Sequence, residues 1–208
     1  KYGTNININF SRIQSIDTTH TSQYKYNSDL FAIGNRLYYQ DFTINVSKKF
    51  SSKFKGSLSY VNMIYDKDIL ENEGAPKYGK IKGNFLIMDG TYRIDDKNAI
   101  RFELQHLWAK QDSAAHIGDT RYGNWITALI EYSISPSFYF SVSDDYNYGN
   151  EFDDLKIHYY SASFTYVVGS NRIQLTYGKQ NQGIICVGGV CRTVPASNGL
   201  YLSISSSF

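Results

Sequence analysis

The sequence lacks long apolar segments, and its longest apolar runs are Phe85–Met88 and Ile184–Val190. Both are far shorter than the roughly 18–20 residues that a transmembrane helix needs, so helices that span a membrane are excluded. An excess of one charge is also lacking, because 21 Lys and Arg residues stand against 19 Asp and Glu residues. The sequence therefore has neither the basic surface expected of a nucleic-acid-binding protein nor an acidic tail.

Proline is scarce, and the three prolines, Pro76, Pro136 and Pro195, all lie between the segments predicted below to be strands. A strand that pairs on both edges needs every backbone N–H, which proline does not have. Aromatic residues are abundant, with 19 Tyr, 12 Phe and 2 Trp. Mean hydropathy is −0.39 although 42% of the residues are hydrophobic. This combination favours strands that alternate apolar and polar residues over helices.

About ten segments of roughly 10–14 residues alternate apolar and polar residues, and they are longer than the roughly 5–6 residues most common in strands. In Gly3–Arg12, isoleucine and phenylalanine alternate with asparagine and serine. The pattern is mixed in Lys53–Tyr65 and imperfect in Lys80–Ile94. It recurs more clearly in residues 36–48, 100–108, 126–134, 138–148, 161–168, 172–177 and 200–208. We therefore predict an all-β fold of about ten antiparallel strands.

The predicted connections alternate between short and long. The short ones are residues 49–52, 95–98, 135–137 and 169–171, and the long ones are 13–35, 66–79, 112–121, 149–155 and 181–197. Outer-membrane barrels have short periplasmic turns and long outer loops. We therefore predict one domain, residues 1–208, that forms a transmembrane up-and-down β-barrel in a bacterial outer membrane. Both termini would be periplasmic and the long loops extracellular.

Tyrosine and tryptophan gather near the ends of the predicted strands, as a girdle at each boundary between water and lipid requires. These residues are Tyr38, Tyr65, Tyr92, Trp108, Trp125, Tyr132, Tyr146, Tyr148 and Tyr160. Ordinary cross-strand aromatic pairs would give part of the same pattern. A soluble β-sandwich or a lipocalin-like barrel, with its apolar rows facing inward, is therefore the architectural alternative.

The final segment resembles the C-terminal assembly signal of outer-membrane barrels, in which a terminal aromatic residue follows an alternating apolar row. The residues that match are Leu200, Leu202, Ile204 and Phe208. Ser206 departs from the pattern, which usually has an apolar or aromatic residue there. The resemblance implies that barrel-insertion machinery recognises this segment during assembly.

The stretch CVGGVCRTVPASNG, residues 186–199, resembles the tail of an uncharacterised family of Bacteroidota outer-membrane β-barrels. Members of that family tend to be longer, which implies that the chain can be the C-terminal part of a larger barrel. The family has no assigned activity, so the resemblance concerns location and not function.

The chain has two cysteines, Cys186 and Cys191, within the same predicted outer loop. A C-x4-C pair without histidine or further cysteine is a poor metal site, and redox-active pairs favour a C-x-x-C spacing. A disulfide formed in an oxidising compartment is the preferred interpretation. We expect no metal and no cofactor.

The polar rows of the predicted strands carry charged residues that would point into the lumen if the apolar rows face lipid. These residues are Asp41, Asp89, Arg93, Arg101, Glu103, Glu131, Asp145 and Arg172. Two interpretations remain open. The charges fill the interior of a small closed barrel as a network, or they line a wider barrel and select solutes.

No catalytic motif of the G-x-S-x-G or phosphate-loop kind is present, and we do not expect an enzyme. The expected function is that of a structural or interaction subunit of an outer-membrane assembly. A diffusion channel or small-solute transporter, porin-like in character, is one alternative. A hydrolase at the outer rim is the other, and it would use Asp144, Asp145, Asp153 or His158.

The expected partners are outer-membrane lipid and lipopolysaccharide, the insertion machinery and other outer-membrane proteins, and not nucleic acid. Two predicted outer loops also contain short strings that look like Bacteroidota O-glycosylation acceptors. They are Asp17-Thr18-Thr19 and Asp112-Ser113-Ala114, so Thr18 and Ser113 are candidate sugar acceptors.

Overall fold

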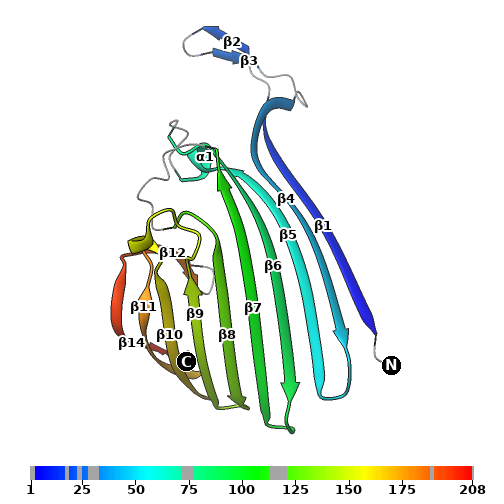
Figure 1. The fold of residues 1–208 in the computed structure, drawn as a ribbon, viewed down its shortest axis with the longest axis vertical. Helices are drawn as coiled ribbons and strands as arrows, with labels where there is room; N and C mark the ends of the chain where they lie inside the picture. The colour runs from blue at the N-terminus through cyan, green and yellow to red at the C-terminus, as the bar shows by residue number, and fades with distance from the viewer. Residues whose placement is uncertain are drawn as a thin grey trace.

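The computed structural model of the chain describes residues 3–16, 19–22, 25–27, 33–71, 77–112, 121–187 and 190–207. Ten of its strands form one sheet, in which each strand pairs with its neighbours antiparallel and in chain order (Figure 1). They are β1 (Thr4–Ile16), β4 (Ile33–Lys49), β5 (Phe54–Asp66), β6 (Lys80–Arg93), β7 (Asn98–Gln111), β8 (Trp125–Ile134), β9 (Phe138–Tyr146), β10 (His158–Val168), β11 (Asn171–Gln180) and β14 (Ser197–Ser205). The predicted all-β, up-and-down arrangement is confirmed.

The remaining elements are small and lie in the connections. The hairpins are β2 (Thr19–Ser22) with β3 (Lys25–Asn27), and β12 (Gly183–Val187) with β13 (Val190–Val194). The helices are α1 (Lys67–Glu71) and the 3₁₀ turn η2 (Asp153–Leu155). No helix in the described part of the chain is long and apolar enough to cross a membrane.

Short and long connections alternate along the sheet, as predicted. Residues 50–53, 94–97, 135–137 and 169–170 are the short turns, and residues 17–32, 67–79, 112–124, 147–157 and 181–196 are the long loops. Figure 1 places the short turns and both ends of the chain at the lower end of the sheet, here called the turn end. The long loops lie at the opposite end, here called the loop end.

The short turns contain local hydrogen bonds that explain where the strands reverse. Asp95 accepts hydrogen bonds from the backbone N–H groups of Lys97 and Asn98, at 2.8 Å each. These bonds, of which the one from Lys97 has the largest effect, hold the pKa of the Asp95 carboxyl below its usual value. Gly169 has a φ of +58°, a left-handed conformation that a glycine adopts readily in a two-residue hairpin turn.

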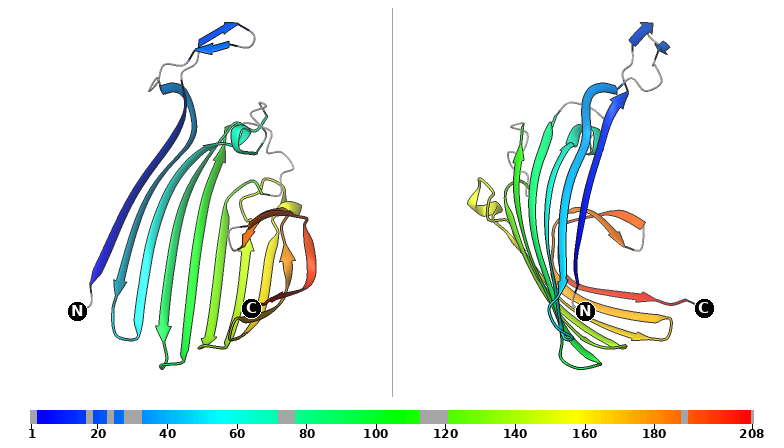
Figure 2. Two further views of the ribbon diagram at one scale, coloured as in Figure 1. Left: turned by 180° about the vertical axis from the view of Figure 1, so that it is seen from behind. Right: turned by 90° about the vertical axis from the view of Figure 1, so that its right-hand side faces the viewer.

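The sheet is strongly curved and open. Within the described residues β1 pairs with β4 and β14 pairs with β11, so each has one edge without a neighbouring strand. The two edges lie at opposite sides of the sheet, and the strands from β10 to β14 curl away from the viewer of Figure 1 (Figure 2). The structure thus shows a curved antiparallel sheet and not a closed barrel.

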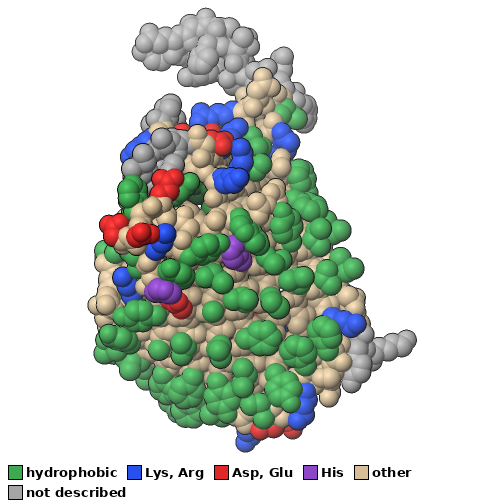
Figure 3. All heavy atoms as spheres, viewed as in Figure 1, with side chains coloured by type: hydrophobic (Ala, Val, Ile, Leu, Met, Phe, Trp, Pro, Cys, Tyr) green, Lys and Arg blue, Asp and Glu red, His purple; other side chains and the backbone are tan. Residues whose placement is uncertain are grey.

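The two faces of the sheet differ in polarity. Large hydrophobic side chains cover the convex face, and charged side chains gather mainly toward its two ends (Figure 3). Because successive residues of a strand point to opposite faces, the serine, threonine and charged residues between them lie on the concave face. The apolar rows therefore face outward, and the described residues do not form the soluble sandwich or lipocalin-like alternative.

A hydrophobic core is lacking in the described part of the chain. Tyr159 is the only buried hydrophobic residue among those whose side chains are described. The accessible surface is 14182 Å², whereas a compact soluble monomer of 23.8 kDa exposes about 9,900 Å². Within the described residues, burial of apolar side chains among themselves is therefore limited, and the convex face exposes a large apolar surface.

Candidate functional site

The apolar band on the convex face has a border of polar residues that bond to one another at its loop end. Asn62 Nδ2 donates to Asn84 Oδ1 at 2.8 Å, and the Tyr60 hydroxyl donates to the same oxygen at 2.8 Å. Farther along the border, His106 Nε2 and the Tyr148 hydroxyl lie 2.6 Å apart in a hydrogen bond. Mutual bonding lowers the cost of placing these groups beside apolar surface.

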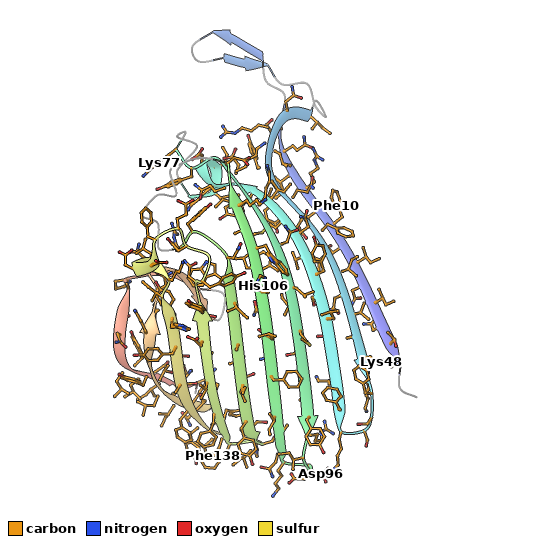
Figure 4. The ribbon with its side chains drawn as sticks, in the orientation of Figure 1. Phe10, Lys48, Lys77, Asp96, His106 and Phe138 are labelled. Carbon is orange, nitrogen blue, oxygen red and sulfur yellow. The ribbon has the colours of Figure 1, made fainter. Side chains whose placement is uncertain are left out.

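The height of the band can be measured along β7. Asn98, which accepts a hydrogen bond from Tyr132 at 2.8 Å, borders it at the turn end, and His106 borders it at the loop end. At roughly 3.3 Å per residue this separation is about 26 Å along the strand. In Figure 4, His106 lies toward the loop end, and Phe138 and Asp96 lie at the turn end.

The aromatic residues predicted to form a girdle lie only in part on the convex face. Tyr92, Trp108 and Tyr160 are exposed members of the convex face and lie toward its borders. Trp125 and Tyr65 instead lie on the concave face, where the ring of Trp125 stacks on Tyr159 with centroids 5.8 Å apart. The prediction was wrong for these two residues because each stands one position out of register with the outward row of its strand.

Arg101 is the centre of a charge cluster on the concave face. Its Nε lies 2.6 Å from Asp89 Oδ2 on β6, and its Nη1 lies 2.5 Å from Glu131 Oε2 on β8. It also forms an ion pair with Glu103, two residues along its own strand. These four predicted lumen residues therefore meet, with three carboxylates around one guanidinium. The contacts run sideways along the wall, between neighbouring strands.

The other four predicted lumen residues lie outside this cluster. Asp41 accepts from Asn9 at 3.2 Å, and Asp145 accepts from the Thr127 hydroxyl at 2.6 Å. Arg172 donates to Gln174 at 3.0 Å. Arg93 lies on the same face at the turn end of β6. The predicted lumen residues thus form one cluster around Arg101 and several separate pairs, instead of one network.

Small polar side chains line the concave face from β8 to β11. The hydroxyls of Ser141 and Ser163 lie 2.6 Å apart, and those of Ser143 and Ser161 lie 2.8 Å apart. A hollow of about 350 Å³ lies beside Ser141 and Ser163, with Arg172 on its border. Because serine fills little volume, this part of the wall leaves space for water.

The residues proposed for hydrolysis at the rim are only partly brought together. His158 Nδ1 lies 2.6 Å from Asp144 Oδ2, and its ring stacks on Tyr146 with centroids 3.8 Å apart. Asp145 points to the other face and Asp153 pairs with Lys156. The structure thus brings two of the four proposed residues, His158 and Asp144, into contact at the loop end of β9 and β10.

At the loop end, Asp68 organises the connection between β5 and β6. Its carboxylate accepts hydrogen bonds from the backbone N–H groups of Tyr78 at 2.6 Å and of Lys77 and Gly79 at 3.0 Å each. These bonds, of which the one from Tyr78 has the largest effect, hold the pKa of the Asp68 carboxyl below its usual value. In Figure 4, Lys77 lies at this end of the sheet.

Several predictions concern residues that are described only in part or not at all. The backbone of the β12–β13 hairpin places Cys186 directly opposite Cys191, but their side chains lie outside the described part, so the disulfide stays a prediction. Leu200, Leu202 and Ile204 form the exposed outward row of β14. Phe208, Thr18 and Ser113 lie outside the described residues.

One concave-face feature was missed by the sequence analysis. A mostly apolar cavity of about 180 Å³ lies at the loop end of β5, β6 and β7, lined by Met63, Gly83, Phe85, Leu107 and Ala109 among others. The signal was the irregular alternation in residues 53–65 and 80–94, where apolar residues occupy both rows. Within the described residues no group of three or more His, Cys, Asp and Glu side chains could hold a metal ion.

Comparisons with known proteins give one match. A model of a protein family, described as a family of unknown function (DUF6029), matches residues 1–208. No curated protein and no solved structure matches the chain.

Proposed function

We propose that this chain, which belongs to the family of unknown function DUF6029, forms the wall of a β-barrel in the outer membrane. In this proposal the polar lumen of the barrel passes small hydrophilic solutes. The carrying observation is the reversed polarity of the sheet, apolar outside and polar inside, without a hydrophobic core in the described residues. In a membrane, lipid tails cover the outer band and satisfy its need for an apolar environment.

The unpaired edges of β1 and β14 favour a closed barrel in the functional state, because each edge needs a neighbouring strand to satisfy its backbone groups. Unpaired backbone N–H and C=O groups cost several kcal/mol each in hydrocarbon, so spanning sheets have no free edge. Ten strands here describe an open arc, which indicates a wider barrel than the small ones that side chains fill. Insertion machinery would assemble this barrel, with the long loops extracellular and both ends periplasmic.

The direction of the charged contacts favours a lumen that is lined and not filled. Arg101 pairs with Asp89 and Glu131 on the strands beside it, so these side chains lie along the wall. The hollow beside Ser141 and Ser163 leaves further space. A water-filled passage needs this arrangement, whereas a plugged small barrel needs side chains that interlock across its interior.

Conductance in a planar bilayer tests the proposal. The purified full chain, with heat-modifiable migration on a detergent gel as evidence of a folded barrel, should give stepwise ionic currents. A heat-modifiable protein that never conducts would reject the channel. Extraction from membranes by alkaline carbonate without detergent would reject the membrane barrel itself.

A second candidate, an interaction subunit of an outer-membrane assembly, is favoured by one observation. Strands β1 and β4 extend beyond the other strands at the loop end and carry the β2–β3 hairpin away from the sheet (Figure 1). Deletion of residues 17–32 should then release a co-purifying outer-membrane protein while heat-modifiable migration is retained. Unchanged co-purification after the deletion would count against this role.

A further inference from the structure

We propose that the cavity at the loop end of the concave face binds a small organic anion with an apolar body, such as an aromatic or short aliphatic carboxylate. This proposal rests on the proposed function for one point, the position of the cavity beside a lumen. The binding itself requires only the local structure of β5, β6, β7 and the loops above them.

The cavity arises from small residues that lie side by side. Gly83 on β6 pairs directly with Met63 on β5 and with Ala109 on β7. Two neighbouring positions therefore have little or no side chain, while Phe85 and Leu107 rise beside them. A Cβ added at Gly83 would lie 3.2 Å from the Phe85 ring and 3.5 Å from Leu107 Cδ1. A larger residue here would fill the space.

The size and lining indicate an apolar ligand body. The cavity measures about 180 Å³ and is bordered mainly by apolar side chains, whereas the concave face toward the turn end carries charges and hydroxyls. An apolar cavity of roughly 150 Å³ holds one benzene molecule. A single aromatic ring or a short alkyl chain therefore fits, and water gains few hydrogen bonds there.

The charge at the cavity indicates an acidic group on the ligand. Lys67 and Arg121 are among its lining residues, and no acidic residue is among the lining residues that the structure describes. Lys67 Nζ also lies 4.7 Å from the centroid of the Tyr78 ring, at the loop that borders the cavity. A carboxylate placed toward these cations is electrostatically favoured over a neutral or cationic group.

Arg121 and Tyr122, which line the cavity, are held in place by hydrogen bonds. Asn147 and Asn150, both buried, donate through Nδ2 to the Tyr122 carbonyl at 2.9 and 3.2 Å. Trp125 Nε1 donates to the Arg121 carbonyl at 3.1 Å. These bonds fix the backbone of Arg121 and Tyr122 before a ligand arrives, which reduces the conformational entropy lost on binding.

Residues 77–79, which belong to the same connection as the lining residue Lys67, are held by hydrogen bonds as well. Gln111 Nε2 donates to the Tyr78 carbonyl at 3.0 Å, and Asp68 binds the backbone of residues 77–79. The described backbone at residues 77–79, where Gly79 O also accepts from the Lys67 N–H at 3.0 Å, and at residues 121–122 is therefore held in place. A preformed site of this kind is what small-molecule recognition usually uses.

Fluorine NMR of 4-fluorobenzoate tests the site in the full chain held in detergent micelles. The resonance should broaden with protein and not with empty micelles, with Kd on the order of 0.1–1 mM for so small a ligand. Ala109→Leu, which fills the cavity, should weaken binding at least about tenfold. Ser57→Leu, which adds the same side chain to the concave face nearer the turn end, should leave it unchanged. Equal binding by wild type and Ala109→Leu, or none by wild type, would overturn the site.

A second variant tests the preference for an anion without altering the sheet. Arg121→Gln should weaken 4-fluorobenzoate binding several-fold and leave the binding of the neutral 4-fluorobenzamide unchanged. An equal effect on both probes, or on neither, would reject the anionic part of the proposal. Conductance of the same preparation separates the proposed channel from the proposed binding site. Binding without current rejects the channel and keeps the site, and current without binding rejects the site.

Discussion

Arg101 on β7 and Glu131 on β8 are direct cross-strand partners, and Arg101 Nη1 lies 2.5 Å from Glu131 Oε2 on the concave face. The same guanidinium is paired with Asp89 and Glu103, so the cluster carries more negative than positive charge. In a lumen, such an excess favours cations over anions at neutral pH.

Replacing Arg101 should therefore increase cation selectivity. Arg101→Gln removes the one positive charge among three carboxylates, so the K⁺/Cl⁻ permeability ratio should rise by about twofold or more. Reversal potentials under a KCl gradient measure this ratio. Lys110→Gln is the matched control, because it removes one positive charge from the outward row of the same strand and leaves the concave face unchanged. A reversal potential that does not move, or that moves equally in the control, would contradict a lumen position for the cluster.

A charge on the outer band should destabilise the protein only if lipid covers that band. Val142 is 63% exposed on the convex face, and its chain neighbour Ser143 lies on the concave face. Val142→Arg should lower the free energy of unfolding in lipid vesicles by about 2–4 kcal/mol, and Ser143→Arg by much less. Denaturant titration in vesicles measures both. A soluble protein would tolerate arginine at an exposed position, so a neutral effect of Val142→Arg would contradict membrane insertion.

The β12–β13 hairpin predicts a disulfide that chemistry can detect. Cys186 and Cys191 are direct cross-strand partners, at a backbone separation that a disulfide accepts. Neither cysteine should react with maleimide in denaturant until a reductant is added, and the closed loop should contribute about 2 kcal/mol to hairpin stability. Mass spectrometry reads the labelling. Two labels without reductant, in protein purified from an oxidising compartment, would contradict the prediction.

Asp68 should control the order of residues 77–79 in a pH-dependent way. Because the folded pKa of Asp68 is depressed, the stabilisation is present above the ordinary pKa of aspartate and is lost as pH falls through the lower folded value. Hydrogen exchange of the Lys77, Tyr78 and Gly79 amides measures this. Protection should be high at neutral pH and should fall at least about tenfold in Asp68→Asn. Asp153→Asn, in a different loop, is the control and should leave these amides protected.

The sequence alone predicted the strands, the apolar and the polar row of each strand, and the alternation of short turns and long loops, because these depend on local patterns. The alternation in residues 3–12 becomes β1, and the prolines at 136 and 195 fall between strands. The charged row was also placed on one face. What the pattern leaves open is which face is the outer one, since a soluble barrel has the same period.

The partners of individual residues depend on lateral register, which strand pairing sets over long sequence separations. Register brought Arg101 to Glu131 and left Arg172 apart from that cluster. It also turned Trp125 to the concave face, against the girdle prediction. A shift of one residue moves a side chain to the other face, so isolated aromatic residues at strand ends are hard to assign.

The period-two pattern by itself determined that this chain forms long antiparallel strands with one apolar and one polar row. Only the tertiary structure decided that the apolar row lies on the convex side of an open curved sheet and that Gly83 and Ala109 lie side by side to form a cavity. The physical reason is that alternation is a property of one strand. Curvature, register and cavities are properties of neighbouring strands packed together.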